Sequence, residues 1–258
     1  MPKPFEIKKS VYALASVDGA TAELIMYGDI YEEVPRDWDD EPIPGNYITL
    51  EEFLEDLKAV EGASKLIIRM NSYGGDAIVA DVIHNRIREL ARAGMATVCI
   101  VDGVAMSGGS LIMCACDEVE VNPSSLIMIH NAWRFMFGGY NSDELLQAAA
   151  ALEAADAMQA AIYVRKTGLA DEEVRAMMRE TTYMTGREAV EKGFANRLIE
   201  DAEPLRIAAS ADRHTLYVGK RELHLAPGMT APENLETIEP PDTWKARMLE
   251  KINKHKED

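Results

Sequence analysis

The sequence predicts an α/β protein built on a mainly parallel sheet, and two observations support this prediction. Short apolar runs such as Ala96–Val101 and Leu126–Ile129 have the length of buried strands. They alternate with longer segments whose apolar residues recur every three or four positions, a pattern typical of βαβ units. The chain has 258 residues, of which 47% are hydrophobic, and this is enough apolar surface for one large core.

The composition argues against several classes of function. The formal net charge is −17, which makes the chain a poor binder of nucleic-acid phosphates or of anionic membrane surfaces. No apolar run reaches the ~18 residues of a membrane span, and the first residues lack the apolar core of a signal peptide. Because Cys99, Cys114 and Cys116 lie in apolar runs, we expect reduced core thiols in a soluble, cytoplasmic protein without nucleic-acid or membrane partners.

The first quarter of the chain contains two short strands and a helix. Apolar residues predict the strands over Val11–Ser16 and Ala22–Tyr27. Residues 32–45 are rich in proline and acid, so we expect a surface loop there. The sequence Thr49-Leu-Glu-Glu52 is a capping box and predicts a helix that continues to about Val60.

Two strand-to-helix units follow. A β-rich run over Lys65–Met70 leads into the glycine-containing loop Asn71-Ser-Tyr-Gly-Gly75, and a helix is expected from Asp76 to Ala93. The apolar strand at 96–101 then leads, through a turn rich in small residues around Ser107, into a short buried helix over Leu111–Ala115.

The remaining elements are shorter, apart from one helix. We expect strands at 118–121, 126–129 and 195–199, helices at 142–166, 171–179 and 186–192, a hairpin at 215–225, a proline-rich linker at 226–243 and an amphipathic helix at 244–254. The first of these helices, with Ser142 as its N-cap, is apolar almost all round. Such a helix must be covered on several sides, either in a central core or, as we prefer, at a subunit interface.

Ser107 is a candidate nucleophile because it lies where a strand gives way to a helix. Its hydroxyl is expected at the edge of the sheet, where backbone N–H groups at a helix start can bind developing negative charge. An ordinary glycine- and serine-rich turn would have the same local sequence. A nucleophile also needs a base that removes its proton, so the histidines decide between these interpretations.

His130 is the best-placed candidate base among the five histidines. It ends the apolar strand 126–129, and the carboxyl ends of parallel strands gather at one edge of a sheet. The same reasoning places Asn71–Gly75 at that edge, where paired glycines can present N–H groups to an oxyanion or hold an extended peptide. His84 lies mid-helix, where we expect a solvated position, and the other three histidines lie in the polar tail.

Taken in order, these segments resemble the Clp protease proteolytic subunit family of the ClpP/crotonase superfamily. The resemblance covers about residues 20–200 and is carried by four motifs: Asn71-Ser-Tyr-Gly-Gly75, Gly103-Val-Ala-Met-Ser-Gly-Gly109, Met128-Ile-His-Asn131 and Glu188-Ala-Val-Glu-Lys-Gly193. It implies a spiral of ββα units with a long handle helix. It also implies a serine protease domain over residues 10–200, followed by an extension over 201–258 that contains the linker and the amphipathic helix.

The resemblance assigns roles to individual residues. Ser107 is the nucleophile, His130 the general base, and Gly75 and Gly108 supply the oxyanion N–H groups. Substrate peptides lie extended between two flanking segments, whose residues here are Gly74, Asp76, Asn131 and Ala132. No metal or cofactor is implied.

The third catalytic position departs from the family pattern. The family's aspartate falls on Thr181, with Glu180 beside it, so either Glu180 reaches His130 or Thr181 and a backbone carbonyl provide a weaker substitute. Proline is usual at the position of Tyr73, and its replacement affects the substrate groove rather than the chemistry. The segment Glu180-Thr-Thr-Tyr-Met184 looks more like bacteriophage ClpP-like proteases than housekeeping subunits.

By this resemblance the chain is a serine endopeptidase, and its setting is phage or prophage head maturation with capsid or scaffold proteins as substrates. A ring-shaped homo-oligomer is implied, and any ATP-driven unfolding requires a separate ATPase, because the chain lacks a phosphate-binding G-x-x-x-x-G-K-[ST] motif. Two alternatives stay open. One is a crotonase-type acyl-CoA enzyme, and the other is a catalytically inactive ring-forming assembly protein.

Overall fold

The computed structural model describes residues 13–18, 20–60, 62–199, 207–218, 221–224 and 237. The chain divides into two units, 1–200 and 201–258. In the second unit, β10 (Ile207–Ala209), β11 (Thr215–Val218) and β12 (Arg221–His224) form an antiparallel sheet. The last two strands are the predicted hairpin. The linker and the helix expected at 244–254 lie outside the described residues, apart from residue 237, and the assignment of residues 201–258 as an extension stays a prediction.

Among the described residues of the first unit, nine strands form one sheet that carries the expected helices, which confirms the predicted α/β fold class. The strand order is β1-β2-β4-β5-β6-β9, where β3 also pairs with β2 and β7 pairs with β5 and β8. All pairs are parallel except β1 with β2 and β7 with β8. The strands are β1 (Ala13–Asp18), β2 (Thr21–Tyr31), β3 (Tyr47–Thr49), β4 (Lys65–Gly75), β5 (Ala96–Met106), β6 (Glu118–Val121), β7 (Leu126–Ile129), β8 (Thr182–Thr185) and β9 (Arg197–Leu198).

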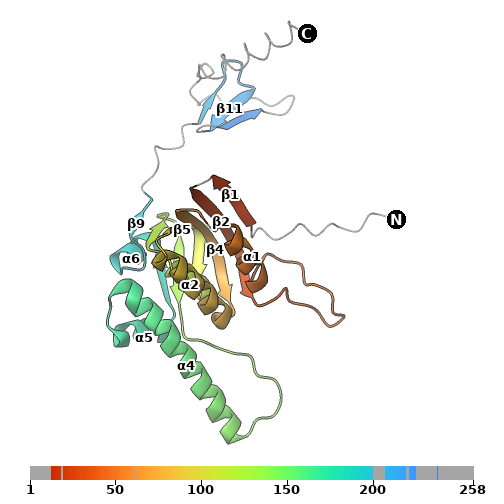
Figure 1. Cartoon of the computed structure of the whole chain (residues 1–258), viewed down its shortest axis with the longest axis vertical. Helices are drawn as coiled ribbons and strands as arrows, with labels where there is room; N and C mark the ends of the chain where they lie inside the picture. Colours follow the sequence, from red (N-terminus) through yellow and green to blue (C-terminus); the bar gives the residue numbers. More distant parts are fainter. Residues whose placement is uncertain are drawn as a thin grey trace. The chain divides into compact units, whose positions relative to one another are not determined.

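Six helices complete the described part of this unit, and Figure 1 shows α1 and α2 against the sheet while α4 projects away from it. Their bounds are α1 (Leu50–Ala59), α2 (Ala77–Arg92), α3 (Gly108–Met113), α4 (Ser142–Thr167), α5 (Asp171–Arg179) and α6 (Gly186–Glu191). Thr49 caps α1 as predicted. The cap of α4 is Asn141 rather than Ser142, because Asn141 forms a reciprocal capping box with Glu144.

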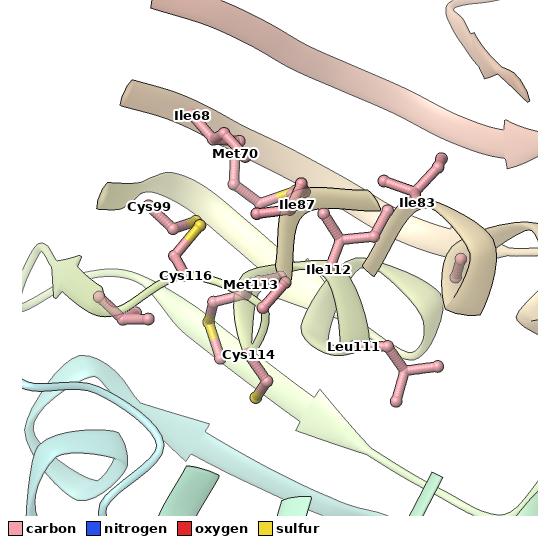
Figure 2. Close-up of a cluster of buried hydrophobic side chains, with 14 of the residues drawn as sticks. Ile68, Met70, Ile83, Ile87, Cys99, Leu111, Ile112, Met113, Cys114 and Cys116 are labelled. Atoms are coloured by element: carbon pink, nitrogen blue, oxygen red, sulfur yellow. The ribbon is translucent and has the colours of Figure 1, made fainter. Parts of the chain in front are cut away.

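The main core lies between the sheet and helices α2 and α3. Figure 2 shows side chains of β4, β5, α2 and α3 meeting there, including Ile68, Ile83 and Ile112. Cys99, Cys114 and Cys116 are free and buried in this layer, as predicted. This packing seats α3, and therefore the turn that precedes it, on the sheet.

Two further expectations for this unit are wrong. The motif Asn71–Gly75 is not a loop but the end of β4. After an irregularity its residues pair again with both neighbouring strands, Ser72 with Ala105 and Gly75 with Ile30. His84 is fully buried rather than solvated, because α3 packs over this face of α2 and the Leu111 carbonyl accepts a hydrogen bond from Nδ1 at 2.7 Å.

The buried His84 predicts a dependence of stability on pH. Burial lowers the pKa of His84 to about 4, whereas the unfolded side chain titrates near 6.5. Between these values the unfolded chain binds more protons, so the unfolding free energy falls as the pH drops from about 6.5 to 4. The loss is at most about 3 kcal/mol. In urea titrations across this range, His84→Gln should show a shallower decline than the wild type. Equal slopes for the two proteins would contradict the assignment.

Candidate active site

Ser107 and His130 meet at the carboxyl edge of the sheet. The Nε2 atom of His130 lies 2.8 Å from the Ser107 hydroxyl oxygen. The register explains this contact, because Met106 at the end of β5 pairs with Met128 in β7, and the Ser107 N–H donates to the Met128 carbonyl at 2.9 Å. Each side chain therefore follows a neighbouring parallel strand, as the sequence predicted. A neutral imidazole at this distance can accept the hydroxyl proton and make the oxygen nucleophilic.

The backbone of Ser107 is strained. Its φ is 51° and its ψ is −123°, a conformation that a residue with a side chain rarely adopts. The strain aims the hydroxyl out of the turn between β5 and α3 and leaves it partly exposed. Sequence reasoning located this turn but had no signal for the strain, since a serine at such a position looks like any other.

The glycines predicted to supply the oxyanion N–H groups lie side by side. A side-chain carbon added to Gly108 would lie 3.5 Å from the amide nitrogen of Gly75, so these two backbones are in contact. The amide of Gly108 follows Ser107 directly and belongs to the first turn of α3. Gly74 packs even closer, because a carbon added there would lie 2.7 Å from both the Met106 carbonyl oxygen and the Ser107 β-carbon.

An open groove of about 560 Å³ runs past the Ser107 hydroxyl. Of the residues predicted to bind substrate, Asp76 and Ala132 border it, together with Gly75. Asp76 also caps α2, since its Oδ1 accepts from the amides of Ile78 and Val79. Asn131 instead borders a separate small pocket, and its N–H donates to the Met178 carbonyl. Side chains that the sequence did not single out for this groove include Tyr31, Trp133, Arg134, Phe135 and Gln159.

The side chain of His130 is half-buried. Burial lowers the pKa of His130, and the negative charge of Asp156, a residue of α4, opposes this effect. Because burial favours the neutral imidazole, the side chain is ready to act as a base near neutral pH.

The two residues predicted for the acid position lie in the turn between α5 and β8. Glu180 is the exposed C-cap residue of α5, and Thr181 follows it with a φ of 54°. The neighbouring Thr182 pairs with Ile129, so the turn lies beside the strand that leads to His130. No described hydrogen bond joins either side chain to the imidazole, and their catalytic roles stay predictions.

Neither a metal cluster nor a membrane-spanning helix is found in the described part of the chain. No group of three His, Cys, Asp or Glu side chains there is arranged to hold a metal ion. No helix among the same residues is both long and apolar enough to cross a bilayer.

The chain is similar to known proteins in three respects: it matches a family model, it shares a fold with a solved structure, and one short segment matches curated relatives. A family model described as Clp protease matches residues 50–202. A ClpP1 mutant from Listeria monocytogenes has a similar structure, with a TM-score of 0.57 and 19% sequence identity over 70% of this chain and 92% of that one. This likeness shows the fold alone.

Two curated relatives match over a short segment. They are the Na(+)/H(+) antiporters NhaA of Brucella melitensis biotype 1 and Brucella abortus (strain 2308), and both are 39% identical to this chain over 75 residues. That segment is 29% of this chain, which spans only 10% of the length of either antiporter. The match therefore carries no argument about ion transport here.

Because Gly74 packs closely against Ser107, we expect a side chain at position 74 to destabilise the protein more than a side chain at position 94. Gly74 and Gly94 have nearly equal φ values of 101° and 100°, but nothing lies within 4 Å of a carbon added at Gly94. Gly94→Ala should cost only the strain of the backbone, about 1–2 kcal/mol of unfolding free energy. Gly74→Ala should cost roughly 1–3 kcal/mol more, because backbone atoms must move apart. Urea titration of both variants measures the difference, and equal losses would contradict the crowding.

Proposed function

The chain belongs to the Clp protease family, and on that premise we propose that it is a serine endopeptidase that cleaves peptide bonds through an acyl-enzyme. The observation that carries the proposal is the 2.8 Å contact between the Ser107 hydroxyl and Nε2 of His130. The groove beside this pair is open, and it is bordered by β-strand ends on one side and by the segment after β7 on the other, which suits a peptide that binds in an extended conformation.

In the proposed reaction, Nε2 of His130 takes the proton of the Ser107 hydroxyl while the oxygen attacks the peptide carbonyl carbon. The carbonyl oxygen becomes an oxyanion, which the N–H groups of Gly75 and Gly108 stabilise. The imidazolium then gives its proton to the leaving amine as the C–N bond breaks, and the acyl-enzyme remains. A water molecule, deprotonated by His130, hydrolyses this ester and restores the serine.

Substrate binding in this scheme relies on backbone groups as well as side chains. The N–H of Ala132 is already donated to Asp156 at 2.6 Å, so a peptide paired with this segment uses other backbone groups. Tyr73, which is 68% exposed, borders the groove where the family usually has proline. Together with Trp133 and Phe135, it favours large apolar side chains next to the scissile bond.

More specifically, we propose that the protease acts in head maturation of a phage or prophage, with capsid or scaffold proteins as substrates. Two features support it: the phage-like sequence Glu180–Met184, and the extension over 201–258 beyond the family match, which ends at 202.

Clp protease family members form ring-shaped homo-oligomers. We place the ring contacts of this chain on α4, whose first half is exposed in the single subunit. A separate ATPase would supply any substrate unfolding.

Labelling with a fluorophosphonate tests the catalytic assignment. The wild type should form a covalent adduct on Ser107, and Ser107→Ala should abolish both the adduct and peptide hydrolysis. His130→Ala should reduce hydrolysis by at least about 1000-fold, since nucleophile and base act as a unit. Intact-mass spectrometry and a fluorogenic peptide measure the two effects.

Ser142→Ala is the matched control, because Ser142 is an exposed serine at the start of α4. Labelling that survives Ser107→Ala would contradict the proposal and favour a crotonase-type enzyme. A wild type that neither labels nor cuts co-expressed scaffold would instead favour an inactive assembly protein.

A further inference from the structure

One buried carboxylate has no role in the reaction as described so far. Asp156 lies in the second half of α4 and is 7% exposed. No Lys or Arg forms an ion pair with it in the described part of the chain. Buried aspartates are rare unless they are paired, because removing the charge from water is costly. The position therefore calls for an explanation other than packing.

The carboxylate is fixed to the segment that carries the base. Its Oδ1 accepts a hydrogen bond of 2.6 Å from the N–H of Ala132, two residues after His130. The side chain borders a pocket of about 270 Å³ together with Asn131, the direct neighbour of His130. Arg175 and Arg179 border the same pocket, but Arg175 is engaged with Asp171 at 2.9 Å and Glu153 at 3.0 Å.

The same helix also holds the segment that carries the nucleophile. Seven residues after Asp156, the Tyr163 hydroxyl lies 2.7 Å from the Ser110 hydroxyl, which in turn donates to the Ser107 carbonyl at 2.6 Å. Because Ser110 spends its only hydroxyl proton on that carbonyl, Tyr163 is the donor in the first contact. Helix α4 therefore forms hydrogen bonds with both the segment that follows Ser107 and the segment that follows His130.

We propose that Asp156 is the positioning residue of the catalytic pair, the carboxylate that orients His130 and stabilises its charged form during acyl transfer. This inference rests on the proposed function. It replaces the family's acid, which falls on Thr181 in this chain, with a carboxylate supplied by α4. The electrostatic effect of Asp156 on His130 has the required sign, since the negative charge favours the imidazolium over the neutral ring.

The rival residues are less suited to this role. Thr181 has no charge, and its N–H is bonded to the Met178 carbonyl. Glu180 is exposed, so water screens its charge. Asp156 is shielded from water, and a buried carboxylate acts on a neighbouring imidazole more strongly than an exposed one does.

Asp156→Asn separates a catalytic role from a structural one. The amide oxygen of asparagine can still accept the hydrogen bond from Ala132, so the local fold is kept, but the charge is lost. The rate of fluorophosphonate labelling at high pH should fall by roughly 10- to 100-fold, because the imidazolium loses its stabilising partner. The acid limb of the pH–rate profile should also move to lower pH, since a base without its anionic partner has a lower pKa. Asp156→Glu should recover part of both effects.

The other charged side chains near the site stay the same in this comparison. Asp76 and Arg134 border the groove with His130, and Glu153, Arg175 and Arg179 border the pocket with Asp156. Asp143→Asn is the control, because Asp143 is an exposed aspartate in the first turn of α4 and does not border the pocket of Asp156. It should leave the labelling rate and the pH profile unchanged.

The outcomes are distinguishable from a failure of the proposed function. If the wild type is not labelled on Ser107, both proposals fail. If the wild type is labelled and Asp156→Asn has the same rate and profile, only the assignment of Asp156 is overturned. A larger loss in Glu180→Gln or Thr181→Ala than in Asp156→Asn would overturn it as well. Should Asp156→Asn melt at a lower temperature, the pH profile of its folded fraction still decides, because a structural loss lowers the amplitude without moving the limb.

Discussion

The structure depends on the way in which strand β5 divides its hydrogen bonds. Its first half pairs with β6, from Val98 to Val101, and its last three residues pair with β7 instead. This change of partner brings the ends of β5 and β7 together, and both candidate catalytic side chains follow directly from those ends. The distance between the Ser107 hydroxyl and His130 is thus a consequence of strand register, and register is fixed by the core side chains of the two strands.

Close backbone approach is the second constraint. The end of β4 runs so near the turn at Ser107 that Gly74 has no room for a side chain, and the backbone of Ile30 in β2 crowds Gly75 in the same way. The strained φ of Ser107 is maintained because α3 is buried and cannot rotate to relieve it: all six of its residues are buried. Packing energy from the core therefore maintains the local geometry that the proposed chemistry needs.

Much of this arrangement is predictable from sequence, and the exceptions have physical reasons. The short strands β6 and β7 and the helix α5 have the predicted bounds, because apolar runs and flanking polar residues define them sharply. The meeting of Ser107 and His130 follows from the rule that parallel strands end at one edge. Strand β8 is not evident, since Thr182–Thr185 owes its pairing to β7 rather than to its own pattern. The predicted solvated position of His84 is wrong for a similar reason. The apolar stripe of α2 indicates one buried face of this helix, but it does not indicate that α3 covers a second face.

Asp156 shows most clearly what the sequence does not predict, which is the direction that a single polar side chain faces. In an alanine-rich helix that is apolar nearly all round, periodicity does not say which side a single aspartate faces, and only the packing of α4 on the His130 segment decides it. The two halves of α4 also differ: Leu145 and Leu146 near its start are exposed, whereas Ile162 and Tyr163 near its end are buried. The same helix thus joins an exposed apolar surface to Asp156 and Tyr163, the two side chains that bind the segments of His130 and Ser107.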